Sequence, residues 1–413
     1  MIKIDDNRTL ALLVLIFALN PIVGILLTTF WVLGSPTAEV NRRKMMCLFL
    51  MLATYMGLLN ATKTPASDQV QYMHAYMLVS DQNLWQSLTN IYGQRYNDAG
   101  TTKEMGYGLL NIVGYYVSFG YYPLFILEFT ILLYMLCFMS IKRLFRAIRP
   151  TYWQTLTVAS VYIMCFYSQY FNLTVHLQRQ EIATAVMLFS IVDYCVSEEY
   201  TWKRFLVPLF AITLHSSVGL FLPLFCVRKI FKNNIERKQL LIILGICLLL
   251  VGASVTIAGS LLSALGGDFY ALDRLSNAGE SIEESFNYNF IFSISLPLLL
   301  IVGKNVFSKK QNTNNTPENI FYLFFLVVVM FYMLIPDATM QYRYFMMSYS
   351  FWPFVIPLLF KKKSLYASVT LSMICVFFFF RFFLTFDGMV WHYTSVDNAL
   401  ACNAISLFMK NPF

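Results

Sequence analysis

Five short polar clusters interrupt a sequence that is otherwise dominated by apolar residues. Two of the clusters have the spacing of one helical face, on which residues three or four apart lie above one another. These two stripes are Asp68, Tyr72 and Tyr76, and Glu104, Tyr107 and Asn111. Each stripe combines a carboxylate, which can accept a proton from a hydroxyl group, with at least one tyrosine, which can stack on a sugar ring.

The other three clusters place arginine or histidine next to apolar runs. They are His176, Arg179 and Gln180; His215, Ser216 and Ser217; and Asp337, Gln341 and Arg343. A guanidinium offers a planar fork of donors that suits a phosphate group, and an imidazole can take up a proton near neutral pH. The five clusters together predict a site that holds a diphosphate and activates a hydroxyl.

Each cluster also has a purely structural interpretation. A surface helix with interfacial tyrosines explains Asp68 and its stripe, and a charge at a helix N-terminus explains Glu104. Arg179 and Arg343 are explained by side chains that extend to lipid headgroups. A lone histidine such as His215 is commonly a hydrogen-bonded residue between helices. We favour the functional interpretation because all five clusters are expected on the same side of a membrane.

The elements that position these clusters are predicted to be membrane helices. The 413 residues are 58% hydrophobic and 13% charged, and about 20 mostly apolar residues cross a bilayer as a helix. We expect one integral membrane domain over residues 1–413, all-α, with about ten spans. The apolar blocks are Thr9–Leu33, Met45–Asn60, Tyr121–Ile141, Tyr152–Phe171, Gln180–Val196, Gln239–Leu265, Tyr288–Gly303, Asn319–Pro336, Tyr342–Phe360 and Ser364–Leu384.

The distribution of basic residues predicts the orientation. Lys and Arg concentrate in short loops such as Arg42–Lys44 and Lys361–Lys363, which face the cytoplasm by the positive-inside rule. Residues 61–120 then form an outer loop with a helix at the outer face, Glu104–Phe119. Phe205–Val227 has basic loops at both ends, so we expect a broken or re-entrant helix pair that meets at Leu214–Gly219.

Composition argues against several other classes of protein. The net charge of +8 lies in the loops between spans, which does not indicate nucleic-acid binding. The eight cysteines contain no CxxC pair, and most lie within apolar blocks, so neither a disulfide framework nor a metal site is expected. We expect no cofactor, since no glycine-rich phosphate loop is present.

At these same residues the sequence resembles the EpsG family of exopolysaccharide and O-antigen polymerases, which are Wzy-type polymerases in the broad sense. The resemblance extends over about residues 10–360. One departure is TPASDQ, where a glycine is expected directly before Asp68. The matching elements, in order, are Asp68, Tyr72 and Tyr76; Glu104, Gly106 and Tyr107; RQEIATA from Arg179 to Ala185; LHSSVGLFLP around His215; and Arg343 with Tyr344.

The resemblance implies a bacterial inner-membrane glycosyltransferase of the C-type fold, with its active site at the periplasmic face. It would join oligosaccharide repeat units carried on undecaprenyl diphosphate. A flippase and a chain-length regulator of the same pathway are candidate partners. The open alternatives are a flippase or transporter of lipid-linked oligosaccharides, and a polytopic acyltransferase.

The chemistry of such a transfer suggests roles for the candidate residues. Arg179 and Arg343 are expected to hold the leaving diphosphate. His215 is the first choice for the base, and Glu104 and Asp68 are its rivals. The expected substrate-binding residues beside the two arginines are Tyr72, Tyr107, His176, Gln180 and Gln341.

Overall fold

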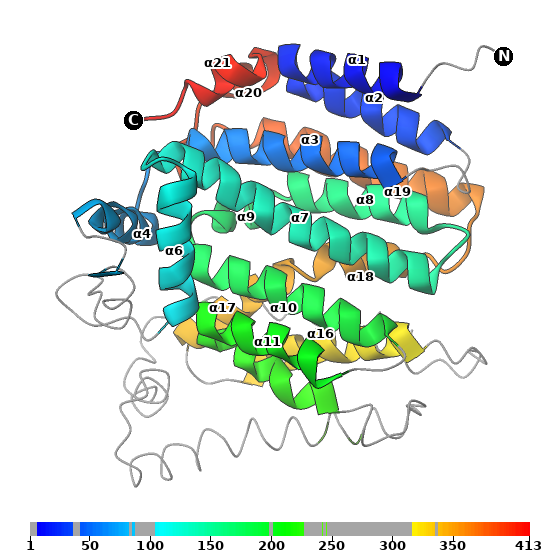
Figure 1. Cartoon of the computed structure of the whole chain (residues 1–413). Coiled ribbons are helices and arrows are strands. Elements are labelled where there is room, and N and C mark those ends of the chain that lie inside the picture. Colours follow the sequence, from blue (N-terminus) through cyan, green and yellow to red (C-terminus); the bar gives the residue numbers. More distant parts are fainter. Residues whose placement is uncertain are drawn as a thin grey trace, which may run out of the picture. The chain divides into compact units, whose positions relative to one another are not determined.

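The computed structural model describes residues 6–35, 42–81, 85–86, 104–197, 201–226, 242, 245, 316–334 and 338–413. Throughout these ranges every regular element is a helix, as Figure 1 shows. The predicted all-α fold is therefore confirmed. The predicted spans Gln239–Leu265 and Tyr288–Gly303 lie almost entirely outside the described residues.

The chain forms two compact units. The first comprises Met1–Asp193, Glu198–Gly219 and Ile356–Phe413, and the second comprises Tyr194–Ser197 and Leu220–Val355. Most of the candidate functional residues lie in the first unit. Gln341 and Arg343 lie in the second unit, so their surroundings are described separately.

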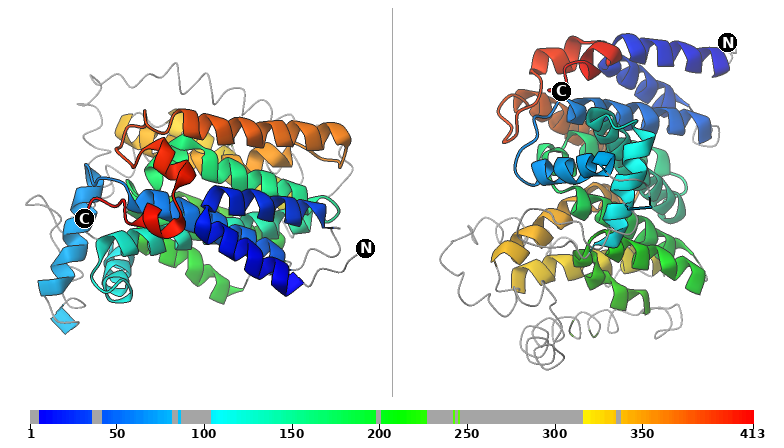
Figure 2. Two further views of the ribbon diagram at one scale, coloured as in Figure 1. Left: turned by 90° about the horizontal axis from the view of Figure 1, so that it is seen from above. Right: turned by 60° about the vertical axis from the view of Figure 1, so that its left-hand side comes forward.

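Long apolar helices form the body of the first unit (Figures 1 and 2). Among the described residues, three helices are long and apolar enough to cross a membrane: α3 (Arg42–Ala61), α7 (Tyr122–Ile148) and α19 (Leu365–Leu384). They correspond to predicted spans. The shorter α8 (Trp153–Phe166), α10 (Gln178–Val196) and α11 (Trp202–Leu214) continue the bundle.

Three predicted single spans are broken, and the prediction of one continuous helix is wrong for each. Thr9–Leu33 becomes α1 (Asp6–Leu19) and α2 (Pro21–Gly34), which lie side by side (Figure 2). Asn20 between them is extended, with φ −149° and ψ 106°, and its side chain caps α2 by accepting from the Val23 amide. Proline disfavours the helical conformation in the residue before it, so Pro21 explains this break.

The other two breaks divide Tyr152–Phe171 and Tyr342–Phe360. The first becomes α8 and α9 (Ser168–Thr174), because Tyr167 adopts an extended conformation with φ −83° and ψ 101°. The second becomes α17 (Ala338–Tyr349) and α18 (Trp352–Leu358). Apolar composition alone does not reveal where a helix is interrupted.

Ion pairs join three helices at one end of the first unit. Asp193 near the end of α10 pairs with Arg143 of α7, and its other oxygen lies 3.6 Å from Nε of Arg204 in α11. The same end carries Lys44 at the start of α3. Several of the basic residues predicted to face the cytoplasm therefore lie at this end.

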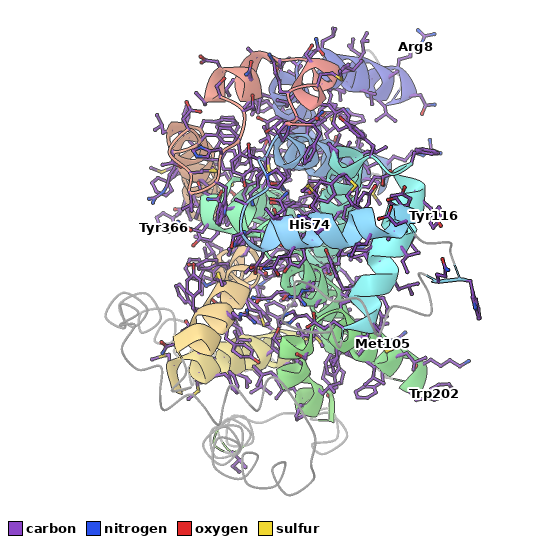
Figure 3. All side chains as sticks on the ribbon, turned by 90° about the vertical axis from the view of Figure 1, so that its left-hand side faces the viewer. Arg8, His74, Met105, Tyr116, Trp202 and Tyr366 are labelled. Atoms are coloured by element: carbon purple, nitrogen blue, oxygen red, sulfur yellow. The ribbon has the colours of Figure 1, made fainter. Side chains whose placement is uncertain are left out.

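Two short helices lie across the opposite end. They are α4 (Asp68–Met77), which continues into η1 (Leu78–Asp81), and α6 (Met105–Val117). Figure 1 shows α6 running across the direction of the long helices, below the start of α7, and Figure 3 looks directly onto this end, with His74 and Met105 labelled. With 13 residues, α6 is too short to span a bilayer. A short helix is therefore present where the sequence predicted one, and its position at the outer face stays a prediction.

The predicted break near Leu214–Gly219 is also present. Helix α11 ends at Leu214, His215 is extended with φ −161° and ψ 127°, and the 3-10 helix η3 (Ser216–Cys226) follows. An interruption at membrane depth is tolerated where it lines a protein or water cavity. The break places the His215 side chain at the end of α11.

The C-terminal segment returns to the same end of the first unit. After α19, residues 385–395 lead to α20 (Val396–Ala401) and α21 (Ala404–Phe408). The Tyr55 hydroxyl donates to the carbonyl of Ala399 at 2.9 Å, and the Asn20 amide donates to the carbonyl of Leu400 at 3.1 Å. These bonds fix the segment against α3 and against the junction of α1 with α2.

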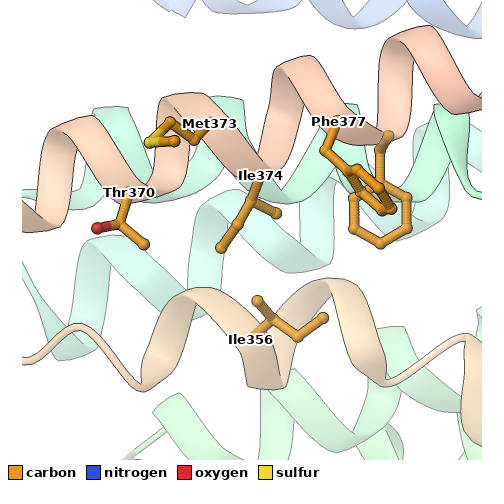
Figure 4. Close-up of a pocket in the computed structure, with 6 residues that line it drawn as sticks. Ile356, Thr370, Met373, Ile374 and Phe377 are labelled. Atoms are coloured by element: carbon orange, nitrogen blue, oxygen red, sulfur yellow. The ribbon is translucent and has the colours of Figure 1, made fainter.

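Away from that end, the outer surface of α19 is apolar. A shallow hollow there is lined by apolar side chains and one threonine, shown in Figure 4. Met373 and Phe377, at 67% and 56% exposure, belong to it. We assign this surface to lipid contact, because a hollow without charged groups cannot bind a diphosphate. The lining residues are Ile356, Thr370, Met373, Ile374, Phe377 and Phe378.

In the second unit, aromatic contacts join α16 (Thr316–Leu334) to α17. The rings of Phe331 and Tyr344 lie 4.5 Å apart, and those of Tyr332 and Phe345 lie 5.5 Å apart. Helix α16 corresponds to the predicted span Asn319–Pro336. This packing fixes the helix that carries Gln341 and Arg343.

Candidate functional site

Glu104 is the centre of the candidate site. Its Oε2 lies 2.8 Å from Nη1 of Arg179, and its Oε1 lies 3.7 Å from Nε2 of His215. The Glu104 and His215 side chains are 14% and 12% exposed, whereas Arg179 is 26% exposed. One partly buried carboxylate thus contacts both the predicted phosphate ligand and the predicted base.

The sequence places Glu104 at this point through the start of α6. Glu104 is the residue directly before the helix, with φ −102°. Two residues later, Gly106 packs against the end of α11, where an added Cβ would overlap the Thr213 side chain and lie 3.0 Å from its backbone carbon. A glycine is therefore needed for this approach, which brings the start of α6 to His215.

Tyr72 forms one wall around Arg179. The Arg179 Cζ lies 5.4 Å from the centre of the Tyr72 ring, a cation–π distance, and Nε lies 3.5 Å from the hydroxyl. Burial raises the pKa of Tyr72 although the nearby Arg179 opposes the shift, so this hydroxyl remains protonated. Tyr72 therefore orients the guanidinium without adding a negative charge.

Tyr107 connects this wall to a residue that sequence reasoning missed. Its ring lies 5.5 Å from that of Tyr72, and its hydroxyl donates to Oε1 of Gln178 at 2.6 Å. Gln178 in turn donates to the Tyr122 hydroxyl at 3.2 Å. The signal for Gln178 was its position beside Arg179 at the mouth of an apolar run. These bonds fix the first turn of α10, from which Arg179 extends.

The ring of His215 has a defined orientation. The amide N–H of Ser217 donates to Nδ1 at 3.2 Å, and the Ser217 hydroxyl lies 2.7 Å from the same nitrogen. Because Nδ1 accepts from the amide, the neutral ring carries its proton on Nε2, which faces Glu104. This chain of Ser217, His215 and Glu104 is suited to moving a proton.

His176 and Asp68 lie beside this group. His176 precedes α10, so it does not share a helical face with Arg179, and its ring is stacked on that of Trp391 with 4.2 Å between the ring centres. Asp68 is the first residue of α4 and is close enough to influence the pKa values of Tyr72 and His176. It is half-buried. Asp68 therefore acts at longer range than Glu104.

The remaining predicted residues have varied surroundings. Gln180 is buried in α10, where its carbonyl accepts from the Thr184 hydroxyl at 2.7 Å. In the second unit, α17 carries the buried Gln341 and the half-buried Arg343. Asp337 lies outside the described residues. The structure thus brings together Glu104, Arg179, His215, Tyr72 and Tyr107.

Within the described ranges, His, Cys, Asp and Glu residues form no group of three that could hold a metal ion. The charged chemistry of the described site is provided by one carboxylate, one guanidinium and one imidazole. These groups can hold an oxyanion and transfer a proton.

A comparison with protein families gives one match. The model of the EpsG family matches residues 43–395, a range that includes every residue of the site described above. No curated protein and no solved structure matches the chain.

Proposed function

This chain belongs to the EpsG family, and we propose that it is a membrane glycosyltransferase that polymerises a surface polysaccharide from repeat units carried on undecaprenyl diphosphate. Membership of this family supports only the general function, that of a polysaccharide polymerase. The lipid-linked donor and the location of the site at the periplasmic face of the bacterial inner membrane are parts of our proposal.

The observation that carries the proposal is the contact of Arg179 and His215 with the two oxygens of Glu104. Polymerisation needs one group to stabilise the leaving diphosphate and another to accept the proton of the attacking hydroxyl. A carboxylate between an arginine and a histidine fixes both in one place. A purely structural ion pair would not need the histidine.

Arg179 is proposed to hold the leaving group. In the transfer, the acceptor hydroxyl oxygen forms a bond to the anomeric carbon, and the bond from that carbon to the diphosphate oxygen breaks. The electron pair leaves with the diphosphate, whose increasing negative charge a guanidinium stabilises by charge-assisted hydrogen bonds. Arg343, which the sequence predicts for the same role, belongs to the second unit, and its part in the transfer stays a prediction.

His215 is proposed as the base, with Ser217 as a relay. Since Nε2 carries the proton of the neutral ring, the lone pair that accepts a proton is on Nδ1, where the Ser217 hydroxyl lies at 2.7 Å. The acceptor hydroxyl gives its proton to Ser217 Oγ, which gives its own to Nδ1. Glu104 then stabilises the imidazolium through Nε2.

The same geometry makes the alternatives less attractive. A flippase is expected to place its charged residues along a central path and to contain internal repeats, whereas these groups gather at one end of the first unit. An acyltransferase would need a second set of groups for its acyl donor. The described residues offer a diphosphate ligand and a base instead.

Deletion of the gene and analysis of the surface glycan by gel electrophoresis test the proposal. A lost polymerase leaves a single repeat unit on the carrier or its acceptor, because units are still made and exported. A lost flippase leaves no exported unit at all. An unchanged glycan ladder, or one without the single unit, would rule out the polymerase.

A further inference from the structure

A second group of polar side chains lies at the same end of the first unit, centred on Lys63. This residue is two positions beyond the end of α3 and is only 1% exposed. Its Nζ is buried, with no hydrogen-bond partner among the described residues. It lies 4.9 Å from the centre of the Trp391 ring.

His176 shares the same tryptophan. Its ring is stacked on Trp391 with 4.2 Å between centres and 30° between planes, and its Nδ1 is buried and likewise unpartnered among the described residues. Two nitrogen atoms that normally make hydrogen bonds are thus covered by one indole ring. Native proteins rarely leave such groups unsatisfied, and each exception needs an explanation.

Trp391 is fixed by the segment between α19 and α20. The Thr64 amide donates to the carbonyl of His392 at 2.9 Å, and the Thr394 amide donates to the Thr62 hydroxyl at 3.2 Å. The segment therefore lies over the turn that follows α3. Trp391 is itself half-buried and lies outside any helix, directly before His392, whose carbonyl accepts one of these hydrogen bonds.

The charge of Lys63 has no acidic partner in its described surroundings. Burying an unpaired ammonium costs several kcal/mol, and burial lowers the pKa of Lys63 to about 7. His176 is neutral at neutral pH, since burial and Lys63 lower its pKa to about 4, and an imidazole cannot supply the negative charge that would pair with Lys63. Asp68 acts on His176 and opposes that shift. Among the described residues, the group thus contains a buried ammonium without a paired anion.

We propose that Lys63, His176 and Trp391 form a second diphosphate site, which takes the diphosphate of the acceptor lipid and opens by a movement of Trp391. This inference rests on the proposed function. A polymerase that joins two lipid-linked units holds two diphosphates at once, and the Arg179 group accounts for one. Lys63 lies two residues beyond the end of α3, a helix long and apolar enough to cross a membrane, so we expect it near the lipid headgroups.

A diphosphate suits this group better than a carboxylate of an acidic sugar. The site lies next to the membrane end of α3, where the head of a polyprenyl lipid is held, whereas the sugars extend away from the bilayer. Lys63 and His176 supply two donors, and a diphosphate offers several oxygens to them. The bound anion would restore the charge of Lys63 by raising its pKa.

The test is to count bound lipids by native mass spectrometry of the full-length protein. Undecaprenyl diphosphate is the probe, without sugars and without turnover. Wild-type protein should bind two molecules, Lys63→Met one, and Lys63→Met with Arg179→Ala none. Lys63→Arg should retain the second molecule. Two bound molecules in Lys63→Met, or one in the wild type, would overturn the proposal.

The chain offers a matched control at the other end of the same helix. Lys44 is 9% exposed, and its Nζ lies 4.8 Å from the centre of the Trp31 ring. Lys44→Met therefore removes a similar lysine–tryptophan contact and should leave two bound molecules. A loss of one molecule in this control would mean that Lys63→Met acts through general destabilisation, and would overturn the assignment.

The pH dependence of binding gives an independent measurement. Lys63 is charged below pH 7 and neutral above it, so the second molecule should bind about tenfold more weakly at pH 8 than at pH 6. His176 stays neutral over this range. Lys63→Arg should retain the second molecule, and because its guanidinium stays charged over this range, it should lose the dependence and also corrects for titration of the probe and of Asp68. A pH dependence that persists in Lys63→Arg would contradict the proposal.

Competition identifies the anion that the second site recognises. Inorganic pyrophosphate should displace the second molecule, whereas glucuronate and undecaprenol should not. If glucuronate displaced the second molecule and pyrophosphate did not, the site would bind an acidic sugar, and the diphosphate proposal would be wrong. Lipid counting needs no polymerisation, so the two proposals can fail separately. A wild-type protein that binds only one molecule contradicts the second site and leaves the polymerase proposal intact. A wild-type protein that binds two molecules but does not polymerise contradicts only the polymerase proposal.

Discussion

Arg179 and His215 meet at one carboxylate, since Nη1 of Arg179 lies 2.8 Å from Oε2 of Glu104 and Nε2 of His215 lies 3.7 Å from Oε1. Arg179 lies in α10, His215 directly follows α11, and Glu104 directly precedes α6. Their convergence depends on how closely α6 approaches α11. The predictions below therefore begin with the residue that permits this approach.

Gly106→Ala should reduce polymerisation strongly. The added methyl group would overlap Thr213, so α6 must move away from α11 and carry Glu104 away from His215. Overpacking of this kind costs about 1–3 kcal/mol of stability. The glycan ladder and the melting temperature of purified protein measure both effects. Gly34→Ala is the control, because nothing lies within 4 Å of its added Cβ. Full activity of Gly106→Ala would show that this contact does not position the site.

Ser217→Ala should slow transfer while preserving binding of the donor. The substitution removes the hydroxyl of the proposed relay, and base catalysis contributes about 10²–10⁴-fold to rates of this kind. We expect at least a tenfold lower kcat with an unchanged KM. The neighbouring Ser216→Ala is the control and should behave like the wild type. Equal rates for both variants would indicate direct proton transfer to His215.

Glu104→Gln should have a larger effect than Asp68→Asn. Both changes preserve size and remove charge, but Glu104 contacts Arg179 and His215, whereas Asp68 acts at longer range. Glu104→Gln should reduce the ladder to single repeat units, and Asp68→Asn should shorten it. The protein level in the membrane must be equal in both strains. A complete ladder from Glu104→Gln would leave this carboxylate as an ordinary helix-end charge.

The orientation of the chain is testable by labelling with a membrane-impermeant thiol reagent. In a chain whose eight native cysteines are replaced, His74→Cys should react in intact spheroplasts and Trp202→Cys should not. Both positions are exposed and belong to the first unit, His74 in α4 and Trp202 at the start of α11 (Figure 3). The opposite pattern would place the site at the cytoplasmic face.

The helices that carry the site were predictable, and their interruptions were only partly so. Composition and spacing indicated α3, α7 and α19, and the basic residues on both sides of Phe205–Val227 indicated the break at His215. The break at Asn20 was overlooked although Pro21 marks it. Hydropathy measures how apolar a segment is, and it does not report the backbone conformation of one residue.

The candidate site shows the same limit. Glu104, Arg179 and His215 were singled out by their chemistry, because charge is rare in this sequence. Gln178 and Thr213 were missed because their roles depend on distances between helices. Lys63 and Trp391 lie far apart in the sequence and become neighbours only through the fold. A single sequence contains no record of such contacts.

The polymerisation rate of Arg179→Ala tests the central claim most directly. The measurement uses purified protein and a lipid-linked repeat unit at matched enzyme concentration. A hydrogen bond to a charged group contributes about 1.5–3 kcal/mol, and each 1.36 kcal/mol is tenfold in rate. The polymerisation rate of Arg179→Ala should therefore be at least about ten- to a hundredfold lower than that of the wild type. The rate of Arg179→Lys should lie between these two, since an ammonium keeps the charge but lacks the planar fork of donors. A wild-type rate for Arg179→Ala would contradict the account and leave Arg179 as a membrane anchor.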